Sequence, residues 1–395
     1  MSMITLQHLL DACSPGGASV LTSVTPLEPA AGPHASVAPA KFVSGSKSVF
    51  AYERRFWNGE AVTAVLIDSK QSQNNRLEAV VSAAIADGDP VLTRTPRIEL
   101  RFEDGQVYSD LDLPHRAFDG QIRAGTINGE TVTSVEEYRK LRDATVSHAR
   151  PLLERSPMTL LLGGWDASRK SHQGRYRSIL VGEIIVILAD QDGGAEANQS
   201  KRGGARIDPV GMRIDLEDKE RKAIAEAQKH ELSASTYKSA SGKNGKVSTL
   251  GLGGIPPSLE QLGGVTCQAI IRSHVLSFAA LRALRFDSPT PEGDVACRAL
   301  LAALALNGLA RSDAELLLRA NCDLVEAGPA VVTLDKRYGQ KESFEPLSID
   351  QAQELLSAAI DHATQVANLT WDGSVLGVEG NPAILAAAAD DAQDD

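Results

Sequence analysis

The sequence of 395 residues predicts an α+β fold. Three runs rich in β-branched and apolar residues, at 61–67, 177–190 and 263–278, have the character of buried strands. Apolar residues recur at helical spacing just after the first run and again at 350–367. A hydrophobic content of 43% is enough for a sizeable core. We therefore expect a globular protein of one large or two ordinary domains.

The N-terminal part is expected to be irregular before the first strands. Residues 14–48 are rich in Pro, Gly, Ala and Ser and show no convincing period, so 1–48 is interpreted as an irregular segment. "AVTAVLI" (61–67) then forms a strand, and Leu77, Val80 and Val81 recur at helical spacing. The polar stretch "DSKQSQNNRLE" (68–78) is therefore a junction between a strand and a helix.

This junction carries an unusual number of hydrogen-bond donors. The start of a helix presents free backbone N–H groups that bind anions readily, and Ser72 is the expected cap. Further side-chain donors surround the same point: Lys70, Gln71, Gln73, Asn74 and Arg76. The stretch therefore predicts an anion site, with an ordinary capped turn on a solvated surface as the alternative.

The next hundred residues contain further strands and a helix. Asp104-Gly105, between the alternating halves of "RIELRFEDGQVYSDLDL" (97–113), is a strong hairpin signal. Ser134 and Glu137 fit a capping box for a helix at 134–145. "MTLLLGGWDAS" (158–168) and "RSILVGEIIVILAD" (177–190) are both interpreted as interior strands, separated by the basic loop "RKSHQGRY" (169–176).

The remaining chain changes character twice. Residues 191–262 are polar and rich in Gly and Ser, with one expected helix at 216–231, so we interpret them as an excursion inserted into a core of residues 49–190 and 263–285. Residues 286–389 are expected to be mainly helical. The acidic tail at 390–395 is expected to be disordered.

Charge and cysteine usage restrict the function class. The net charge of −11 is uneven, because residues 286–395 hold 6 Lys/Arg and 19 Asp/Glu while residues 1–285 hold 34 and 32. Four cysteines without a CxxC pair are expected to be small buried core residues. The N-terminus has no basic region before an apolar stretch, and Glu183 interrupts the most apolar long segment. We expect a cytoplasmic protein with no membrane contact.

Common catalytic motifs are absent. The sequence has no P-loop, dinucleotide fingerprint, HExxH, GxSxG or paired metal-ligand spacing. Asp190 and Asp192 could bind a metal, and His115 or His172 could act as a base, but a turn-forming acidic pair and hydrogen-bonding histidines are the favoured interpretations. No catalytic residue, metal or cofactor is predicted.

Clustered basic loops at strand ends suit single-stranded nucleic acid. Arg and Lys side chains bind phosphates without reading sequence, and neutral donors fix the geometry. Aromatic residues make up only 4% of the chain, so contacts are expected to be mainly to the nucleic-acid backbone.

Five motifs in order carry a resemblance to a known family. The chain resembles the Cas-seven-type backbone subunit, of the RAMP superfamily, in type I-G (formerly type I-U) CRISPR effector complexes. The similarity runs from about residue 50 to residue 285 and is carried by "DSKQSQNNRLE", "LPHRAFDGQIRAG", "LLLGGWDASRKSHQGRYRSILVGEI", "SKRGGARIDPVGM" and "TLGLGGIPPSLEQLGGVT".

The resemblance implies both a fold and a set of partners. The implied core is a modified RNA-recognition (ferredoxin-like) domain with large insertions and a helical C-terminal part. Copies would stack head to tail along a CRISPR RNA and offer its bases to target DNA, beside a large Cas-eight-like subunit and a fused Cas-five/Cas-six-like subunit. The residues expected to bind RNA are Arg54, Arg55, Lys70, Gln71, Ser72, Gln73, Asn74, Arg76, His115, Arg116, Arg169, Lys170, Arg175, Lys201, Arg202 and Arg206.

One departure and one alternative remain. The aromatic RNP1 pattern of ordinary RNA-recognition domains is missing, so the expected core depends on the resemblance. The alternative function is a metal-dependent nuclease that uses Asp190, Asp192 or Asp208, whereas the resemblance implies a subunit without enzymatic activity.

Overall fold

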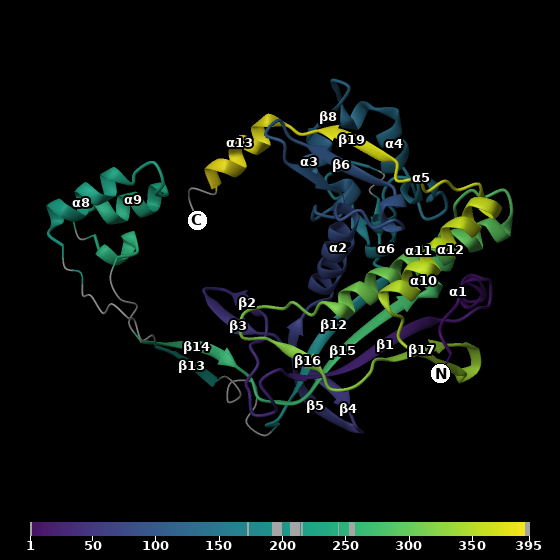
Figure 1. The fold of residues 1–395 in the computed structure, drawn as a ribbon, viewed down its shortest axis with the longest axis horizontal. Coiled ribbons are helices and arrows are strands. Elements are labelled where there is room, and N and C mark those ends of the chain that lie inside the picture. Colours follow the sequence, from purple (N-terminus) through teal and green to yellow (C-terminus); the bar gives the residue numbers. More distant parts are fainter. Residues whose placement is uncertain are drawn as a thin grey trace. The chain divides into compact units, whose positions relative to one another are not determined.

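A computed structural model gives the fold (Figure 1) and describes residues 2–171, 174–191, 200–205, 214, 216–243, 245–252 and 257–391. The chain forms two compact units: a larger one of Met1–Gln199 and Gly264–Gly380, and a smaller one of Ser200–Gly263 and Asn381–Asp395. Helices and strands occur together, which confirms the predicted α+β class.

The larger unit is built on an eight-stranded sheet. Its order is β18-β17-β1-β15-β12-β5-β4, and β16 also pairs with β1. Each described pair in this sheet is antiparallel. The strands are β1 (Val20–Pro29), β4 (Tyr52–Trp57), β5 (Glu60–Asp68), β12 (Leu180–Leu188), β15 (Cys267–Ser277), β16 (Leu324–Glu326), β17 (Val331–Asp335) and β18 (Lys341–Phe344).

Two helical connections define the topology of this sheet. β1 and β12 are both antiparallel to β15, which lies between them, so they run parallel to each other, and helix α2 (Lys70–Ala86) lies in the connection from one to the other. In the same way β15 and β17 flank β1, and their connection carries α11 (Pro291–Ala314). These two interleaved split βαβ connections form the pattern of a ferredoxin-like βαββαβ unit. The β4–β5 hairpin is inserted before α2 and widens the sheet beyond β12.

Helices cover one face of the sheet (Figure 1). They include α1 (Leu6–Cys13), α10 (Phe278–Ala283), α11 and α12 (Ile349–Ala367). An 18-residue window of α11 has a mean hydropathy of 1.3, sufficient in length and composition for a membrane span, but 83% of it is buried inside the protein, as in the core helix of a globular domain. The predicted apolar face of α12 is buried and includes Leu356, Ile360 and Ala363. The core therefore lies between the sheet and these helices.

The packing of α2 against α11 depends on a small residue. Leu77 of α2 is buried against Gly308 of α11, where an added Cβ would lie 2.8 Å from the leucine Cδ2 atom. Glycine at this position therefore allows the two crossover helices to approach closely. This contact holds the middle of α2 against α11.

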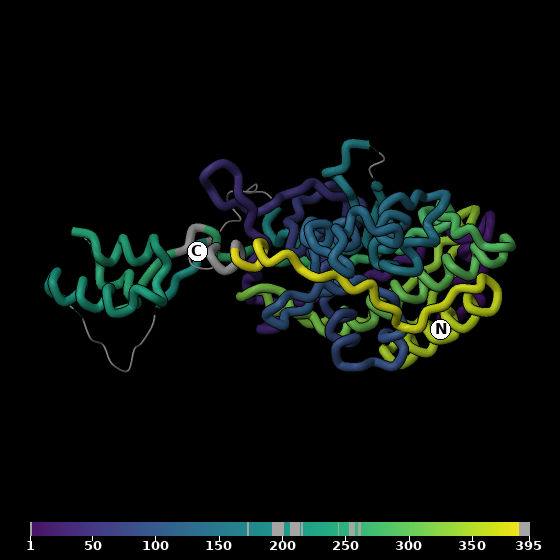
Figure 2. Tube along the Cα trace, turned by 90° about the horizontal axis from the view of Figure 1, so that it is seen from above, coloured from purple at the N-terminus to yellow at the C-terminus, as the bar shows by residue number. Residues whose placement is uncertain are grey.

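A second sheet lies in the same unit, in the order β7-β6-β19-β8-β9. The predicted Asp104-Gly105 hairpin is confirmed by the pairing of β6 with β7 and by the positive φ of Gly105. Figure 2 shows the yellow C-terminal strand beside the blue segment of β6, with which it pairs in parallel. The strands are β6 (Arg97–Arg101), β7 (Val107–Ser109), β8 (Thr126–Ile127), β9 (Glu130–Thr131) and β19 (Val375–Glu379).

Short elements complete the two units. The larger unit has two small hairpins, β2 (Lys41–Ser44) with β3 (Lys47–Phe50) and β10 (Gly164–Trp165) with β11 (Arg175–Tyr176). Its short helices are η1 (Leu92–Arg94), η2 (Arg116–Phe118), α3 (Gly120–Ala124), η3 (Val132–Ser134), α4 (Glu136–Arg142), α5 (Arg150–Leu153), α6 (Pro157–Leu162) and η5 (Arg337–Gly339). The smaller unit contains β13 (Ser200–Gly204), α8 (Asp218–Ala227), α9 (Ala234–Ser241), η4 (Val247–Leu250), β14 (Ser258–Gly264) and α13 (Pro382–Asp391).

The prediction that residues 14–48 are irregular is wrong. β1 lies inside the main sheet, and its burial alternates from residue to residue. Pro26 lies between Val24, where pairing with β17 ends, and Leu27, where pairing with β16 begins, so its missing N–H interrupts no pairing on that side. Prolines therefore concealed a central strand. Residues 286–389 likewise contain four strands that the helical prediction missed.

Two further local predictions are wrong. The apolar run at 158–168 begins as the buried helix α6, which has Pro157 at its start and ends before Gly163, whose φ is +91°. A short run that is apolar on all sides does not distinguish a buried strand from a buried helix. The capping box at Ser134 and Glu137 is also wrong, because α4 starts at Glu136 and Ser134 Oγ donates to the Thr131 carbonyl.

Candidate nucleic-acid interface

A fully buried carboxylate organises the junction between β5 and α2. Asp68 accepts hydrogen bonds from Ser72 Oγ at 2.9 Å, Gln73 Nε2 at 2.6 Å, Arg76 Nε at 2.9 Å and Arg319 Nη2 at 3.0 Å. Burial alone would raise the pKa of Asp68. The hydrogen bonds and charge of Arg76, together with hydrogen bonds from Gln73 and Ser72, lower it. The junction is therefore held together by an ionised, buried aspartate.

Three side chains predicted to face RNA are thus directed at Asp68. Ser72, Gln73 and Arg76 satisfy a buried charge, and a buried charge is costly unless it is paired and hydrogen-bonded. The prediction of Ser72 as the helix cap is wrong, because the cap is Ser69, whose Oγ accepts from the Ser72 N–H at 3.2 Å. We leave these three residues out of the interface.

The outer face of the same helix start remains available. Asn74 is buried, and its Nδ2 donates to Ser178 Oγ at 3.5 Å, which places the first turns of α2 beside the segment after β11. Lys70 and Gln71 precede Asn74 by four and three residues, so they lie on the same side of the helix, and both are exposed. Their side chains can therefore reach a ligand that lies over this segment.

The segment that Asn74 contacts supplies two exposed arginines. Arg175 and Arg177 alternate with the buried Tyr176, so they lie on the same side of the chain. Arg175 stacks over the ring of Trp165, with its Cζ atom 5.1 Å from the ring centroid. Arg177 and Trp165 were missed by sequence reasoning, although Arg177 directly follows the basic loop at 169–176.

We define the junction surface as Lys70, Gln71, Trp165, Arg175 and Arg177. Each of these side chains is exposed. They come from the start of α2 and from the β10–β11 hairpin, and the contact between Asn74 and Ser178 joins the two elements. Three cations, an amide and an aromatic ring can bind phosphates and an unpaired base without reading a sequence.

Two further residues of the basic loop were predicted to bind RNA, Arg169 and Lys170. Lys170 is exposed beside the β10–β11 hairpin. Arg169 forms an ion pair with Asp143 at 2.5 Å and donates to the Arg142 carbonyl at 3.3 Å. Lys170 can thus add to the positive charge near the junction surface, whereas Arg169 attaches the loop to α4.

Arg116, which was predicted to bind RNA, instead contacts groups inside the protein. Its guanidinium is buried, pairs with Glu78 and donates to the Gly163 carbonyl at 3.0 Å. Burial raises the pKa of the Glu78 carboxyl, against the lowering effect of the Arg116 charge. The neighbouring His115 is exposed, and its backbone N–H donates to Asp119. Arg116 therefore joins α2 to the turn after α6.

Arg54 and Arg55 lie on the edge strand β4, apart from the junction surface. Arg54 Nη1 donates to Thr63 Oγ1 at 2.9 Å, and Arg55 pairs with Glu183 at 3.0 Å and Glu53 at 2.6 Å. The hydrogen bond and charge of Glu183 raise the pKa of Arg55 against the effect of burial. These contacts connect strands of the sheet.

The last predicted residues belong to the smaller unit or lie outside the described residues. Lys201 and Arg202 are on β13, and Arg202 donates to the Gly263 carbonyl. Arg206, His172, Asp192 and Asp208 lie outside the described residues. Within the part of the chain that the structure describes, no group of three His, Cys, Asp or Glu side chains is placed to hold a metal ion.

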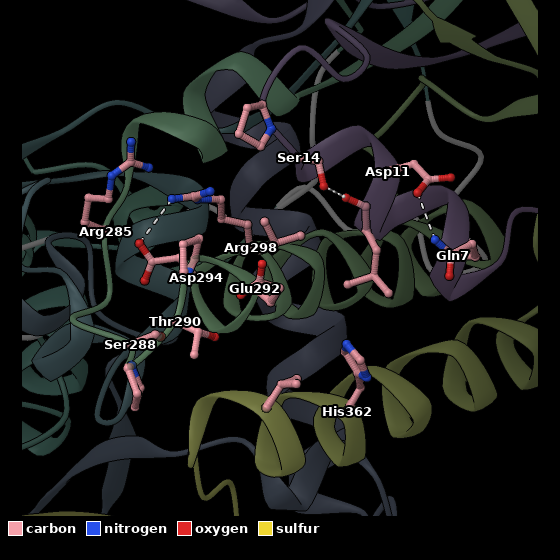
Figure 3. Close-up of a pocket in the computed structure, with 16 residues that line it drawn as sticks. Gln7, Asp11, Ser14, Arg285, Ser288, Thr290, Glu292, Asp294, Arg298 and His362 are labelled. Atoms are coloured by element: carbon pink, nitrogen blue, oxygen red, sulfur yellow. Dashed lines mark hydrogen bonds and ion pairs between the residues drawn. The ribbon is translucent and has the colours of Figure 1, made fainter.

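A pocket of about 880 Å³ lies between α1, the start of α11 and α12 (Figure 3). Its lining has charges of both signs: Asp11, Glu292, Asp294, Arg285 and Arg298. Arg298 pairs with Asp294 at 3.3 Å and donates to a backbone carbonyl at 2.8 Å. Because its carboxylates oppose a polyanion, we exclude this pocket from the interface.

Comparison with known families identifies the part of the chain that carries this surface. Residues 21–191 match the family described as CRISPR-associated protein GSU0053 (Cas_GSU0053), a family of the Cas-seven type in type I-U/I-G systems. The match spans β1, β5, α2, the β10–β11 hairpin and β12, and thus the whole junction surface. The two motifs after residue 200 lie outside it. No curated protein matches the chain.

Proposed function

We propose that the protein is the RNA-binding backbone subunit of a type I-G CRISPR effector complex. Several copies stack head to tail along one CRISPR RNA, and each holds a short segment of the guide so that its bases are open to target DNA. The observation that carries the proposal is the junction surface, which lies within the residues that match the CRISPR-associated family.

The chemistry of the junction surface suits a guide of any sequence. Lys70, Arg175 and Arg177 supply positive charge, and Gln71 supplies an amide donor for phosphate oxygens. The overall charge of −11 does not oppose this role, because the excess of acidic residues lies in 286–395. RNA affinity should fall steeply with salt, with a log–log slope of roughly −0.7 per phosphate contacted on a single strand.

The proposal includes the remaining parts of the complex. The partners are further copies of this chain, a large Cas-eight-like subunit, a fused Cas-five/Cas-six-like subunit and target DNA, all in the cytoplasm. Neighbouring copies use two different faces of the chain, because head-to-tail contacts that do not close into a ring generate a filament. The subunit itself has no enzymatic activity.

The test is purification of the full chain after expression with its CRISPR array and partner subunits. We expect bound RNA of uniform length and a particle mass that requires several copies of this chain. Preparations free of RNA, or RNA binding that depends strongly on spacer sequence, would contradict the proposal. Cleavage of guide or target in magnesium or manganese would instead favour the metal-dependent nuclease that uses Asp190, Asp192 or Asp208.

A further inference from the structure

Trp165 is an exposed aromatic residue on a firmly held backbone. Half of its surface is exposed, although it lies in the paired strand β10 directly after the buried helix α6. Single exposed apolar residues are common on protein surfaces, but an aromatic ring held on an ordered element presents a face on which a ligand can stack.

Close packing beneath the hairpin fixes the position of this ring. A Cβ on Gly164 would lie 2.8 Å from Thr159 Cγ2 and 3.1 Å from the Phe118 ring, and one on Gly174 would lie 3.3 Å from the same ring. The Phe118 and Tyr176 rings stack at a centroid distance of 6.2 Å and an interplanar angle of 17°. Both ends of the hairpin are therefore seated on Phe118.

A buried ion pair holds the residue after Trp165. Asp166 is 1% exposed, and its carboxylate accepts from Arg142 Nε at 2.6 Å and from Ser168 Oγ at 3.2 Å. Its backbone N–H also donates to the Gly174 carbonyl at 3.0 Å. The backbone on either side of Trp165 is thus fixed by contacts that do not involve the indole, which leaves the ring itself available.

We propose that Trp165 stacks an unpaired nucleobase of single-stranded nucleic acid, while Arg175 and Arg177 bind the adjoining phosphates. The proposal rests on the proposed function and adds a specific nucleotide contact to it. Arg175, which lies over the indole, moves to a phosphate when a base takes its place on the ring. Stacking accepts every base because every base has a π face, so the contact suits a guide of variable sequence.

Nucleic acid is favoured over a protein occupant by charge. The exposed charged residues nearest to the ring along the chain are basic: Lys170, Arg175 and Arg177. Such a surface would repel a basic partner, whereas it complements a polyanion. Guide RNA and target DNA both offer unpaired bases, and the experiment separates these two sources.

The test compares Trp165→Leu, which keeps an apolar side chain without a ring, with Trp165→Phe, which keeps an aromatic ring, in the full-length chain. Oligonucleotides short enough to hold one copy are titrated as RNA, as DNA and as abasic strands. We expect Trp165→Leu to weaken binding of the base-bearing strand by about tenfold and Trp165→Phe by much less. The abasic strand should bind wild type and Trp165→Leu equally. A loss confined to RNA identifies guide bases, and a loss confined to DNA identifies target bases.

Four outcomes would overturn the inference. Equal binding of base-bearing strands by wild type and Trp165→Leu would contradict the stacking contact, and the proposed function would still stand. An equal loss on abasic strands would show that the ring supports the backbone contacts or the fold. Reduced self-association of Trp165→Leu without nucleic acid, with unchanged oligonucleotide binding, would assign the ring to a neighbouring copy. Failure of the wild type to bind any strand would reject the proposed function as well.

Discussion

The guanidinium of Arg319 donates a 3.0 Å hydrogen bond to the carboxylate of Asp68, across 251 positions of sequence. The aspartate is fully buried and the arginine is 30% exposed. The partly solvated positive charge of the arginine therefore partly neutralises the buried negative charge of the aspartate. With Arg76 this contact ties the end of β5, the start of α2 and the segment after α11 together. The geometry of the junction surface depends on this arrangement.

Replacement of Asp68 should destabilise the fold. Asp68→Asn removes the negative charge and leaves Arg76 and Arg319 without their shared partner, so we expect the free energy of unfolding to fall by about 3 kcal/mol. Urea unfolding of the wild type and the variant measures this change. Asp361→Asn is a matched control, because its pair with Arg94 is exposed and should be worth less than about 1 kcal/mol. Equal losses in both variants would contradict the central role of Asp68.

Charge reversal at the junction surface should weaken RNA binding without unfolding the protein. Lys70→Glu with Arg177→Glu places two carboxylates where phosphates are expected, and we expect reduced affinity and a log–log salt slope that is shallower by about 0.7 per lost contact. Filter binding at several salt concentrations provides both quantities. Lys341→Glu, on β18 at the opposite edge of the sheet from β4 and β5, is the control. Unchanged affinity in the double variant would exclude this surface.

Gly182 and His274 should be energetically coupled. They are cross-strand neighbours on β12 and β15, and a Cβ on Gly182 would overlap the buried imidazole ring. We expect Gly182→Ala to destabilise the wild type by about 1–3 kcal/mol through overpacking, and to cost much less when His274→Ala has made room. A double-mutant cycle from urea denaturation measures the coupling. Additive effects would show that the ring moves aside freely.

The same histidine should make stability depend on pH. Burial, with a smaller effect of the Arg272 charge, lowers the pKa of His274 from 6.5 to about 3. Above pH 6.5 the ring is neutral in both states, whereas below it the unfolded chain gains a proton that the folded protein does not. Relative to His274→Gln, the wild type should therefore lose stability as pH falls from about 7 to about 3, by up to ~1.4 kcal/mol per pH unit. Parallel pH profiles of the two proteins would contradict this.

Local sequence patterns predicted the elements that carry a clear strand, helix or turn signal. β5 and α2 follow from a β-branched run and a helical repeat, and the β6–β7 hairpin follows from Asp104-Gly105. β1 and α6 were missed because prolines masked alternation in the first and a short apolar run is ambiguous in the second. In both cases tertiary burial, which a short window of sequence does not contain, decides the structure.

The sequence pattern predicts an interface at the start of α2, but several of the predicted side chains have partners inside the protein. Gln73, Arg76 and Arg116 bind buried carboxylates. Some of the neighbouring donors are used in contacts inside the protein. Which ones are used depends on partners such as Arg319, which only the folded chain brings close. Trp165 was missed because an exposed ring and a buried ring look alike in sequence.

The parallel pairing of β6 with β19 affects the order in which the chain can fold. Residues 97–101 pair with residues 375–379, so the middle strand of the second sheet can be added only after residue 379 has been synthesised. Until then the β6–β7 and β8–β9 hairpins have no strand to join them, and contacts of such long sequence separation form slowly. A chain synthesised only as far as residue 374 therefore leaves one edge of β6 unpaired, so this pairing is a late step in the folding of the larger unit.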